Sequence, residues 1–414
     1  MHNVRWRILA LLFFATTINY LDRILLGFLL PAIRQESHIT DQEYGYITGA
    51  FQVAYTIGFL IAGKYIDRVG TRVGYAVALA WWSIAAGLHA LSAGALSLGG
   101  WRALLGLGEA GNFPAAIKGV AEWFPKKDRA FATGIFNAGS NVASMVGPPM
   151  FAVINERYGW RACFLLTSTL GAVWLVAWLA WYRTPEQHPS VTGEELAYVR
   201  SDAVDQATEP KISWAQAFGY RQTWGYAIAK FLTDPVWWFY LFWVPPYLFD
   251  VRGLDLKQIG WALPAIYLMA DFGSVGGGWL SGFLIGRGWP NGKARKTAMG
   301  LCAAAMPIAA LSVLAESPVL AIGLISIATA AHQGWSANLY TTASDVFPKS
   351  ATASVTGIGG CFGGLGGVLF SAVIPGYVVT HFGYKPMFLV LGAFHLTALV
   401  FVHKLLGDMR PIAR

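Results

Sequence analysis

Residues 9–30 read L-A-L-L-F-F-A-T-T-I-N-Y-L-D-R-I-L-L-G-F-L-L. A helix needs roughly 20 predominantly apolar residues to cross the hydrocarbon core of a bilayer, and this stretch is long enough to do so. Asp22 and Arg23 stand inside the stretch and not at its ends. The run is also too long and too polar for the core of a cleaved signal peptide. We therefore predict a membrane-spanning helix that carries charge at bilayer depth.

Eleven further apolar runs follow, in two groups separated by a polar gap. They are Gly45–Ala62, Val73–Ser92, Leu96–Ile117, Thr133–Ile154 and Ala162–Trp181, then Tyr226–Phe249, Ile259–Ile285, Ala298–Leu314, Leu320–Leu339, Val355–Val379 and Met387–Val402. The pattern predicts an all-α integral membrane protein with twelve transmembrane helices in two six-helix bundles. We place the bundles at residues 1–185 and 221–414, with a cytoplasmic linker at 186–220 in which residues 190–195 are typical of a helix start.

The composition supports a lipid-facing surface. Only 13% of the 414 residues are charged, against roughly 25% in soluble proteins. With the amino terminus in the cytoplasm, 21 of the 30 Lys and Arg fall on the cytoplasmic side, six on the other side and three inside spans. This bias predicts that both termini are cytoplasmic. The net charge of +8 thus reflects topology, and we expect no nucleic-acid partner.

Three kinds of motif are absent from the sequence, and their absence excludes several classes of function. The cysteines Cys163, Cys302 and Cys361 lie in or beside spans without the spacing of a disulfide framework or a metal site. No phosphate-binding loop is present, so we expect an ion or substrate gradient to supply the energy and no cofactor to be needed. No nucleophile–base pair or H-E-x-x-H cluster indicates an enzyme.

Several motifs resemble one transporter family. Gly63–Arg72 matches the G-x-x-x-D-R-x-G-x-R signature of the major facilitator superfamily. Similarity to its anion:cation symporter family rests on Arg102–Ala110, Phe113-Pro114, Trp123–Pro125 and Asp128–Ala130. Similarity to bacterial hexuronate transporters rests on Lys230–Pro235, Ala270-Asp271, Ala331–Gln333 and Ser344–Phe347. The resemblance extends over the whole chain and implies a location in the bacterial inner membrane.

Charged side chains inside the predicted spans are the first candidates for function. Each costs on the order of 3 kcal/mol or more at bilayer depth, unless it has a partner or a wet cavity. Seven such residues occur: Asp22, Arg23, Arg102, Glu109, Lys230, Asp234 and Asp271. We therefore expect them to mark a substrate or ion pathway.

The resemblance implies roles for the charges of the first bundle. Asp22 and Glu109 match positions that carry protons. Four residues match positions at or near the substrate: Tyr20, Arg23, Tyr55 and Arg102. In low dielectric a carboxyl group can exchange a proton near neutral pH, while a nearby guanidinium favours its ionised form, so substrate binding beside an arginine changes the proton affinity of the acid. The alternative is that Asp22 with Arg102, or Arg23 with Glu109, form structural ion pairs.

A second set of charges stands at the edge of the same bundle. Asp67, Arg68 and Arg72 lie at the predicted cytoplasmic ends of spans, where we expect them to hold helices together in one conformation and not to contact substrate. We assign the same gating or structural role to Asp234 and Asp271.

The second bundle offers a different binding surface. Lys230 stands one helical turn before Asp234 and close to several tryptophans, including Trp238. An ammonium group beside flat aromatic faces suits a hydroxylated anion; alternatively, Lys230 only neutralises Asp234. Polar rows in two other spans add Gln333 and Ser336, and Asn137 and Ser140, as candidate contacts, although such rows also serve helix–helix bonding. His332 is more simply explained by packing.

Together these features predict a proton-coupled symporter that imports a sugar-acid anion by alternating access, with a hexuronate such as glucuronate or galacturonate as substrate. The alternatives are a symporter for aldonates or aldarates, an organic-anion antiporter, or a membrane sensor that binds substrate without flux. Galactonate-type relatives place an amide near Gly360, which this chain lacks. We expect a small-molecule substrate, protons as the coupling ion, the lipid bilayer as environment and a monomer.

Overall fold

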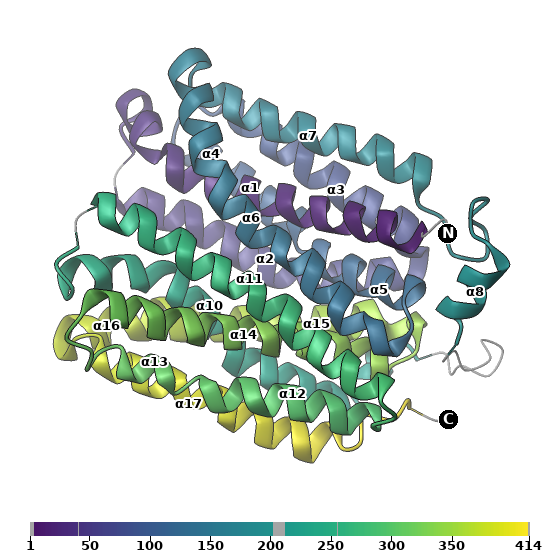
Figure 1. Ribbon diagram of the computed structural model, residues 1–414. Coiled ribbons are helices and arrows are strands. Elements are labelled where there is room, and N and C mark those ends of the chain that lie inside the picture. Colours follow the sequence, from purple (N-terminus) through teal and green to yellow (C-terminus); the bar gives the residue numbers. More distant parts are fainter. Residues whose placement is uncertain (1–3, 40, 202–211, 255, 413–414) are drawn as a thin grey trace. The chain divides into compact units, whose positions relative to one another are not determined.

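The computed structural model describes residues 4–39, 41–201, 212–254 and 256–412 (Figure 1). The first half contains α1 (Val4–Ser37), α2 (Asp41–Val69), α3 (Thr71–Leu88), α4 (Ala95–Glu109), α5 (Asn112–Trp123), α6 (Lys126–Tyr158), α7 (Trp160–Trp181) and the short α8 (Gly193–Val199) and α9 (Trp214–Ala217). The second half contains α10 (Arg221–Asp250), α11 (Leu256–Gly286), α12 (Asn291–Ala305), α13 (Ile308–Leu311), α14 (Pro318–Val346), α15 (Lys349–Gly367), α16 (Ile374–Phe382) and α17 (Lys385–Phe401).

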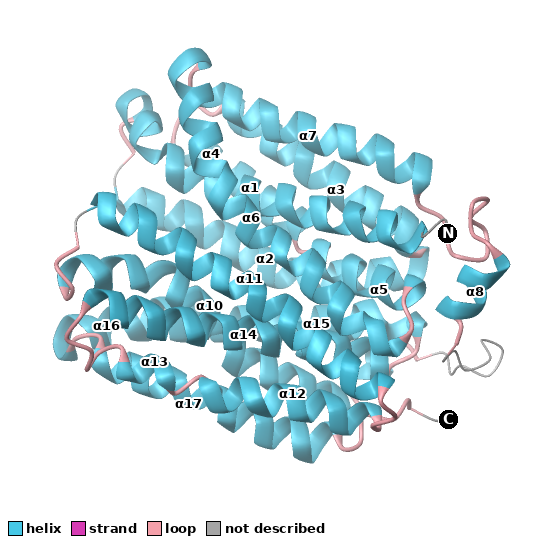
Figure 2. Ribbon diagram, in the orientation of Figure 1, coloured by secondary structure: helices cyan, strands magenta, loops and turns pink. Residues whose placement is uncertain are grey.

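The described residues form helices and connecting turns, and none of them lies in a strand (Figure 2). Each of the twelve predicted apolar runs coincides with one helix or with helices that follow one another directly. Seven helices of the described chain are long and apolar enough by themselves to cross a membrane. Those that fall short include α4 and α12, which have 15 residues each. The predicted all-α membrane fold is confirmed.

Several predicted spans consist of more than one helical segment, including the fourth and the eleventh. The fourth consists of α4 and α5, which are separated at Ala110-Gly111. The eleventh runs from α15 through a π-helical segment, η3 (Val368–Val373), into α16. Such π segments occur frequently at functional sites. The first break is more informative, because it makes Glu109 the last residue of α4.

The chain forms two compact units. Unit 1 comprises residues 1–125, 139–207 and 349–361, and unit 2 comprises 126–138, 208–348 and 362–414. Each therefore includes one short segment from the other half of the sequence. In unit 1 the buried core includes Leu25, Phe151 and Phe164.

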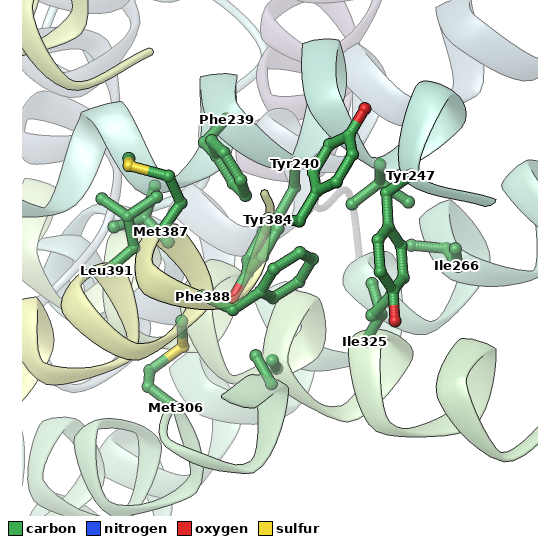
Figure 3. Packing of buried hydrophobic residues seen from close by; sticks show 14 of the residues in the cluster. Phe239, Tyr240, Tyr247, Ile266, Met306, Ile325, Tyr384, Met387, Phe388 and Leu391 are labelled. Carbon is green, nitrogen blue, oxygen red and sulfur yellow. The ribbon is translucent and has the colours of Figure 1, made fainter. Parts of the chain in front are cut away.

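The core of unit 2 is rich in aromatic side chains (Figure 3). Phe239 and Tyr247 of α10 pack around Phe388 of α17, with ring centroids 5.4 and 5.1 Å from its ring. Met306 and Ile325 complete the same cluster. Edge-to-face and tilted ring contacts of this kind add about 0.5–1.5 kcal/mol each beyond buried area, and they fix α10 against α17.

The predicted helix start at residues 190–195 is confirmed as the beginning of α8. Thr192 is its N-cap, and the Thr192 hydroxyl accepts a hydrogen bond from the Glu195 amide at 3.2 Å. The Glu195 carboxylate in turn accepts the backbone N–H groups of Val4 and Arg5 at 3.2 and 3.0 Å. A carboxylate at a helix N-terminus satisfies unpaired N–H groups and complements the helix dipole, so α8 caps α1. Residues 202–211 of the predicted linker lie outside the described residues.

Candidate functional site

A buried ion pair joins α1 to the end of α4 inside unit 1. Nη2 and Nε of Arg23 lie 2.9 and 3.1 Å from Oε2 of Glu109. Glu109 has no exposed surface, whereas the Arg23 side chain keeps 17% of its surface accessible. Arg23 also donates to the Asn19 side chain at 3.3 Å, as their four-residue spacing on one helix face suggests. A ligand can therefore reach the Arg23 guanidinium, whereas the Glu109 carboxylate paired with it is inaccessible.

The surroundings of Asp22 differ from those of Glu109. Asp22 is 1% exposed, and neither carboxylate oxygen has a hydrogen-bond partner among the described residues. Thr167 faces it, but the Thr167 hydroxyl donates to the carbonyl of Phe164 at 3.2 Å. Asp22 is thus a buried acid without a direct side-chain ion pair, so the alternative of an Asp22–Arg102 pair is not what the structure contains.

Arg102 instead binds the backbone of α1. Its two terminal nitrogens donate to the carbonyl oxygens of Asp22 at 3.1 Å and Arg23 at 2.8 Å, and its side chain is almost fully buried. This guanidinium therefore fixes the turn of α1 that carries the acid and the base. It also keeps a positive charge beside both carboxyl groups of the cluster.

Three aromatic rings line Arg23. Its guanidinium carbon lies 4.7 Å from the ring centre of Tyr20, 4.4 Å from that of Tyr55 and 5.4 Å from that of Phe51. Cation–π contacts of this kind contribute about 0.5–2 kcal/mol each. Phe51 also contacts Arg102, at 5.5 Å. Sequence reasoning missed Phe51, because one aromatic residue in an apolar run carries no distinguishing signal.

Close helix packing brings these groups together. A Cβ added at Gly106 of α4 would collide with the backbone carbonyl of Phe51 in α2. The glycine therefore lets the two helices approach until their backbones are in contact. This approach brings Phe51 and Tyr55 of α2 and Glu109 of α4 into contact with the same Arg23 side chain.

Unit 2 holds a second ion pair. Nζ of Lys230 lies 2.7 Å from an Asp234 carboxylate oxygen, one turn along α10, and 3.9 Å from the ring centre of Tyr340 in α14. Lys230 is buried, and Asp234 retains 18% of its side-chain surface. A Cβ at Gly363 would collide with the Asp234 carboxylate, so the glycine-rich α15 packs directly on this pair.

The tryptophans near Lys230 have separate packing partners. Trp237 stacks on the ring of His332, with centroids 5.7 Å apart. Trp238 is half-buried and packs so closely on α15 that a Cβ at Gly367 would enter its ring. The aromatic ring that contacts the Lys230 ammonium is therefore that of Tyr340.

The remaining predicted contacts are placed as follows. Asn137 donates to Gln333 at 2.7 Å, so these two amides join α6 to α14 within unit 2. Ser140 is buried in α6 and Ser336 is half-buried in α14. Asp271 is half-buried in α11. The polar rows of α6 and α14 therefore serve helix–helix bonding at least at Asn137 and Gln333.

Two charged residues of the Gly63–Arg72 motif, Asp67 and Arg72, hold helix ends within unit 1. Asp67 pairs with Lys118 at 2.8 Å and accepts the backbone N–H groups of Ala353 and Ser354 at the start of α15, at 3.2 and 2.6 Å. Arg72 donates to the Leu179 carbonyl near the end of α7 at 2.6 Å.

The Arg68 side chain is exposed and has no hydrogen bond or ion pair to another described side chain. Among the described residues its charge therefore does not hold these helices together, unlike those of its neighbours Asp67 and Arg72.

A buried charge cluster in unit 2 was missed. Asp345 at the end of α14 pairs with Arg295 at 3.0 Å and with Arg129 at 3.4 Å, and Arg295 has no exposed surface. These three charges lie just beyond the ends of predicted apolar runs, where charge is unremarkable. The only sequence feature that could have indicated this cluster is the presence of opposite charges at the ends of successive spans.

The groups gathered in unit 1 are of the kinds that pair with anions and exchange protons. They include an accessible guanidinium, two buried carboxyl groups and a lining of aromatic rings. Among the described residues no group of three His, Cys, Asp or Glu side chains could hold a metal ion. The chemistry available is therefore ion pairing, hydrogen bonding and proton exchange.

This fold and this cluster of intramembrane charges define a class of membrane transport protein. The chain matches the Major Facilitator Superfamily over residues 12–371 and belongs to that family, whose members are transporters and not enzymes. The solved structure of the proton:xylose symporter XylE bound to 6-bromo-6-deoxy-D-glucose matches with a TM-score of 0.75 at 13% identity, covering 97% of this chain and 95% of that chain. That likeness concerns the fold alone.

Two curated bacterial proteins are similar at the sequence level. The hexuronate transporter of Escherichia coli (strain K12) is 33% identical over 415 residues, which cover 99% of this chain and 95% of that protein. The galacturonate transporter of Dickeya chrysanthemi is 34% identical over 280 residues, which cover 67% of this chain and 81% of that protein.

Proposed function

We propose that this protein is a proton-coupled symporter that imports a sugar-acid anion, specifically a hexuronate such as glucuronate or galacturonate. It works in the inner membrane of a bacterium with both termini in the cytoplasm, by alternating access of the substrate site to the two faces of the membrane. The observation that carries the proposal is the Arg23–Glu109 pair, in which a partly accessible guanidinium is bound to a fully buried carboxylate.

Coupling follows from competition for Arg23. When a substrate carboxylate binds the guanidinium, Glu109 loses the ion pair that offsets the cost of its burial. An unpaired buried charge is strongly unfavourable, so Glu109 takes up a proton as the substrate binds. Release of the substrate restores the pair and expels the proton. Asp22, which is buried without a hydrogen-bond partner among the described residues, is the second proton carrier.

The substrate class is supported by chemistry and by similarity. A hexuronate carries one carboxylate and several hydroxyl groups, which suit a guanidinium and the hydroxyls of Tyr20 and Tyr55 around it. Lys230 is buried beside Asp234 and Tyr340 and offers a second positive group. A substrate group can replace Asp234 at Lys230, as the substrate carboxylate replaces Glu109 at Arg23. Both curated relatives described above are named for hexuronate substrates.

The test is uptake of labelled glucuronate into proteoliposomes with an imposed inward proton gradient. We expect the parent protein to accumulate glucuronate only with the gradient. Glu109→Gln should lose accumulation while still exchanging internal for external glucuronate. Glu156→Gln, the same substitution at an exposed position in α6, is the matched control and should accumulate like the parent.

The alternative functions give other results. An aldonate or aldarate symporter would show gradient-driven uptake of galactonate or glucarate and none of glucuronate. An organic-anion antiporter would exchange substrate equally well with and without the gradient, and Glu109→Gln would not change the effect of pH. Either result would replace the proposal.

A further inference from the structure

A basic cavity lies in unit 2 at the end that carries the carboxyl terminus. Its volume is about 660 Å³. Three separate parts of the chain supply its cationic lining: the start of α6, the first turns of α12 and the carboxyl-terminal segment after α17. The lysine and arginine side chains are Lys126, Lys293, Lys296 and Arg410, and His403 also lines the cavity.

The positive charge of this cavity is only partly offset. Among the described residues Asp408 is the one carboxylate in its lining, and it pairs with Arg410 at 3.3 Å, both side chains being largely exposed. Lys293 and Lys296 line the same space and have no carboxylate partner among the described residues. Convergence of like charges is unfavourable unless an anion is present to offset it.

The positive-inside bias explains why lysines occur on this side of the membrane. It does not require them to surround one cavity, so their convergence is a separate observation.

The backbone adds to the preference for an anion. The 15-residue α12 begins at Asn291 in the cavity wall, and the first N–H groups of a helix have no partner within the helix. Both polar atoms of the Asn291 amide are buried and lack a hydrogen-bond partner among the described residues.

The wall is also held rigidly. Arg295, one turn into α12, donates to the carbonyl of Lys126 at 2.6 Å, so the starts of α6 and α12 are fixed to each other. A site of this kind can bind a ligand without first having to be ordered.

The surroundings of the cavity are typical of the depth of lipid headgroups. Trp289 precedes α12 and keeps 36% of its surface exposed, and Nζ of Lys293 lies 4.5 Å from its ring centre. Tryptophan is enriched at membrane–water interfaces. Basic pockets at this depth on the cytoplasmic side bind phosphate headgroups.

We propose that this cavity binds the phosphate group of a phosphate ester, with Lys293 and Lys296 as its principal contacts. An anionic phospholipid in the adjoining leaflet and a soluble phosphate ester are two sources of the same chemistry. This inference concerns a site remote from Arg23 and Glu109, and it does not depend on the identity of the transported substrate.

The experiment is native mass spectrometry of the purified full-length protein. The probes are dioleoyl-phosphatidylglycerol, dioleoyl-phosphatidylcholine and glycerol 3-phosphate, each titrated separately. The test variant is Lys293→Gln/Lys296→Gln. The control is Lys404→Gln, which removes an exposed lysine beside His403 that does not line the cavity. Size-exclusion chromatography confirms that all variants remain monodisperse.

We expect phosphatidylglycerol to bind more tightly than phosphatidylcholine. The double variant should bind it about 30-fold more weakly, equivalent to about 2 kcal/mol, because each lysine near a membrane surface contributes about half of that. The control should change binding less than twofold. Binding of glycerol 3-phosphate with the same dependence on the two lysines supports a soluble source, and binding of the lipid alone supports a headgroup. Equal binding by parent and double variant, or no preference for the anionic probes, would overturn the proposal.

Discussion

Replacement of Arg23 with glutamine removes the ion-pair partner of a carboxylate that has no exposed surface. At the observed separation of 2.9 Å, Coulomb attraction amounts to about 6 kcal/mol with an effective dielectric constant of about 20. The cost of desolvating the two charges offsets part of this attraction. Removal of one partner from a buried pair costs about 3–5 kcal/mol. Because Glu109 is fully buried, we expect Arg23→Gln to lower the free energy of unfolding by an amount in this range.

The assay is a double-mutant cycle measured by denaturant unfolding in mixed micelles. The four proteins are the parent, Arg23→Gln, Glu109→Gln and the double variant. The double variant should be more stable than Arg23→Gln, because it contains no unpaired carboxylate. Arg287→Gln, at an exposed position, should change stability by less than about 1 kcal/mol. If the effects of the two single substitutions add to within about 0.5 kcal/mol, the two residues do not interact energetically and the reasoning fails.

Two further predictions concern packing and pH. Gly366→Ala places a Cβ against the backbone carbonyl of Phe231 and should cost about 1–3 kcal/mol by overpacking; Gly276→Ala, with nothing within 4 Å of the added carbon, should be neutral or stabilising, and equal effects in thermal unfolding would contradict the packing. Hydrogen bonds from Arg161 and the indole beside it lower the pKa of Glu36 from 4.5 to about 2, so its stabilising contribution is complete above pH 4.5 and lost as pH falls towards 2. Glu36→Gln should therefore lower the melting temperature at pH 7 but not near pH 2, and a pH-independent difference would refute this assignment.

The sequence is sufficient to predict the helices and the presence of intramembrane charge. Hydropathy locates the twelve runs because a span must satisfy its own backbone and face lipid. It also marks Asp22, Arg23 and Glu109 as exceptions, since charge is rare at bilayer depth. The break after Glu109 was not predicted, because Ala110 and Gly111 are compatible with a continuous helix and only the packing shows otherwise.

Pairing between helices could not be predicted in the same way. Which acid meets which base depends on the rotation and separation of α1 and α4, and sequence spacing says nothing of either. Two pairings were compatible with the sequence, and the structure contains Arg23 with Glu109, while Arg102 binds backbone carbonyls. The charges around Asp345 were missed for a related reason: a charged residue beyond a span end looks solvated until another chain segment is known to cover it.

The proton-carrying role of Glu109 is the central claim, and proton movement driven by substrate tests it most directly. Proteoliposomes would be loaded with a pH-sensitive dye at equal internal and external pH, and glucuronate would be added outside. We predict internal acidification by the parent protein at a rate proportional to glucuronate uptake, and none by Glu109→Gln in vesicles that still exchange glucuronate. Glucuronate uptake by the parent without acidification, or acidification that persists in the variant, would contradict the account.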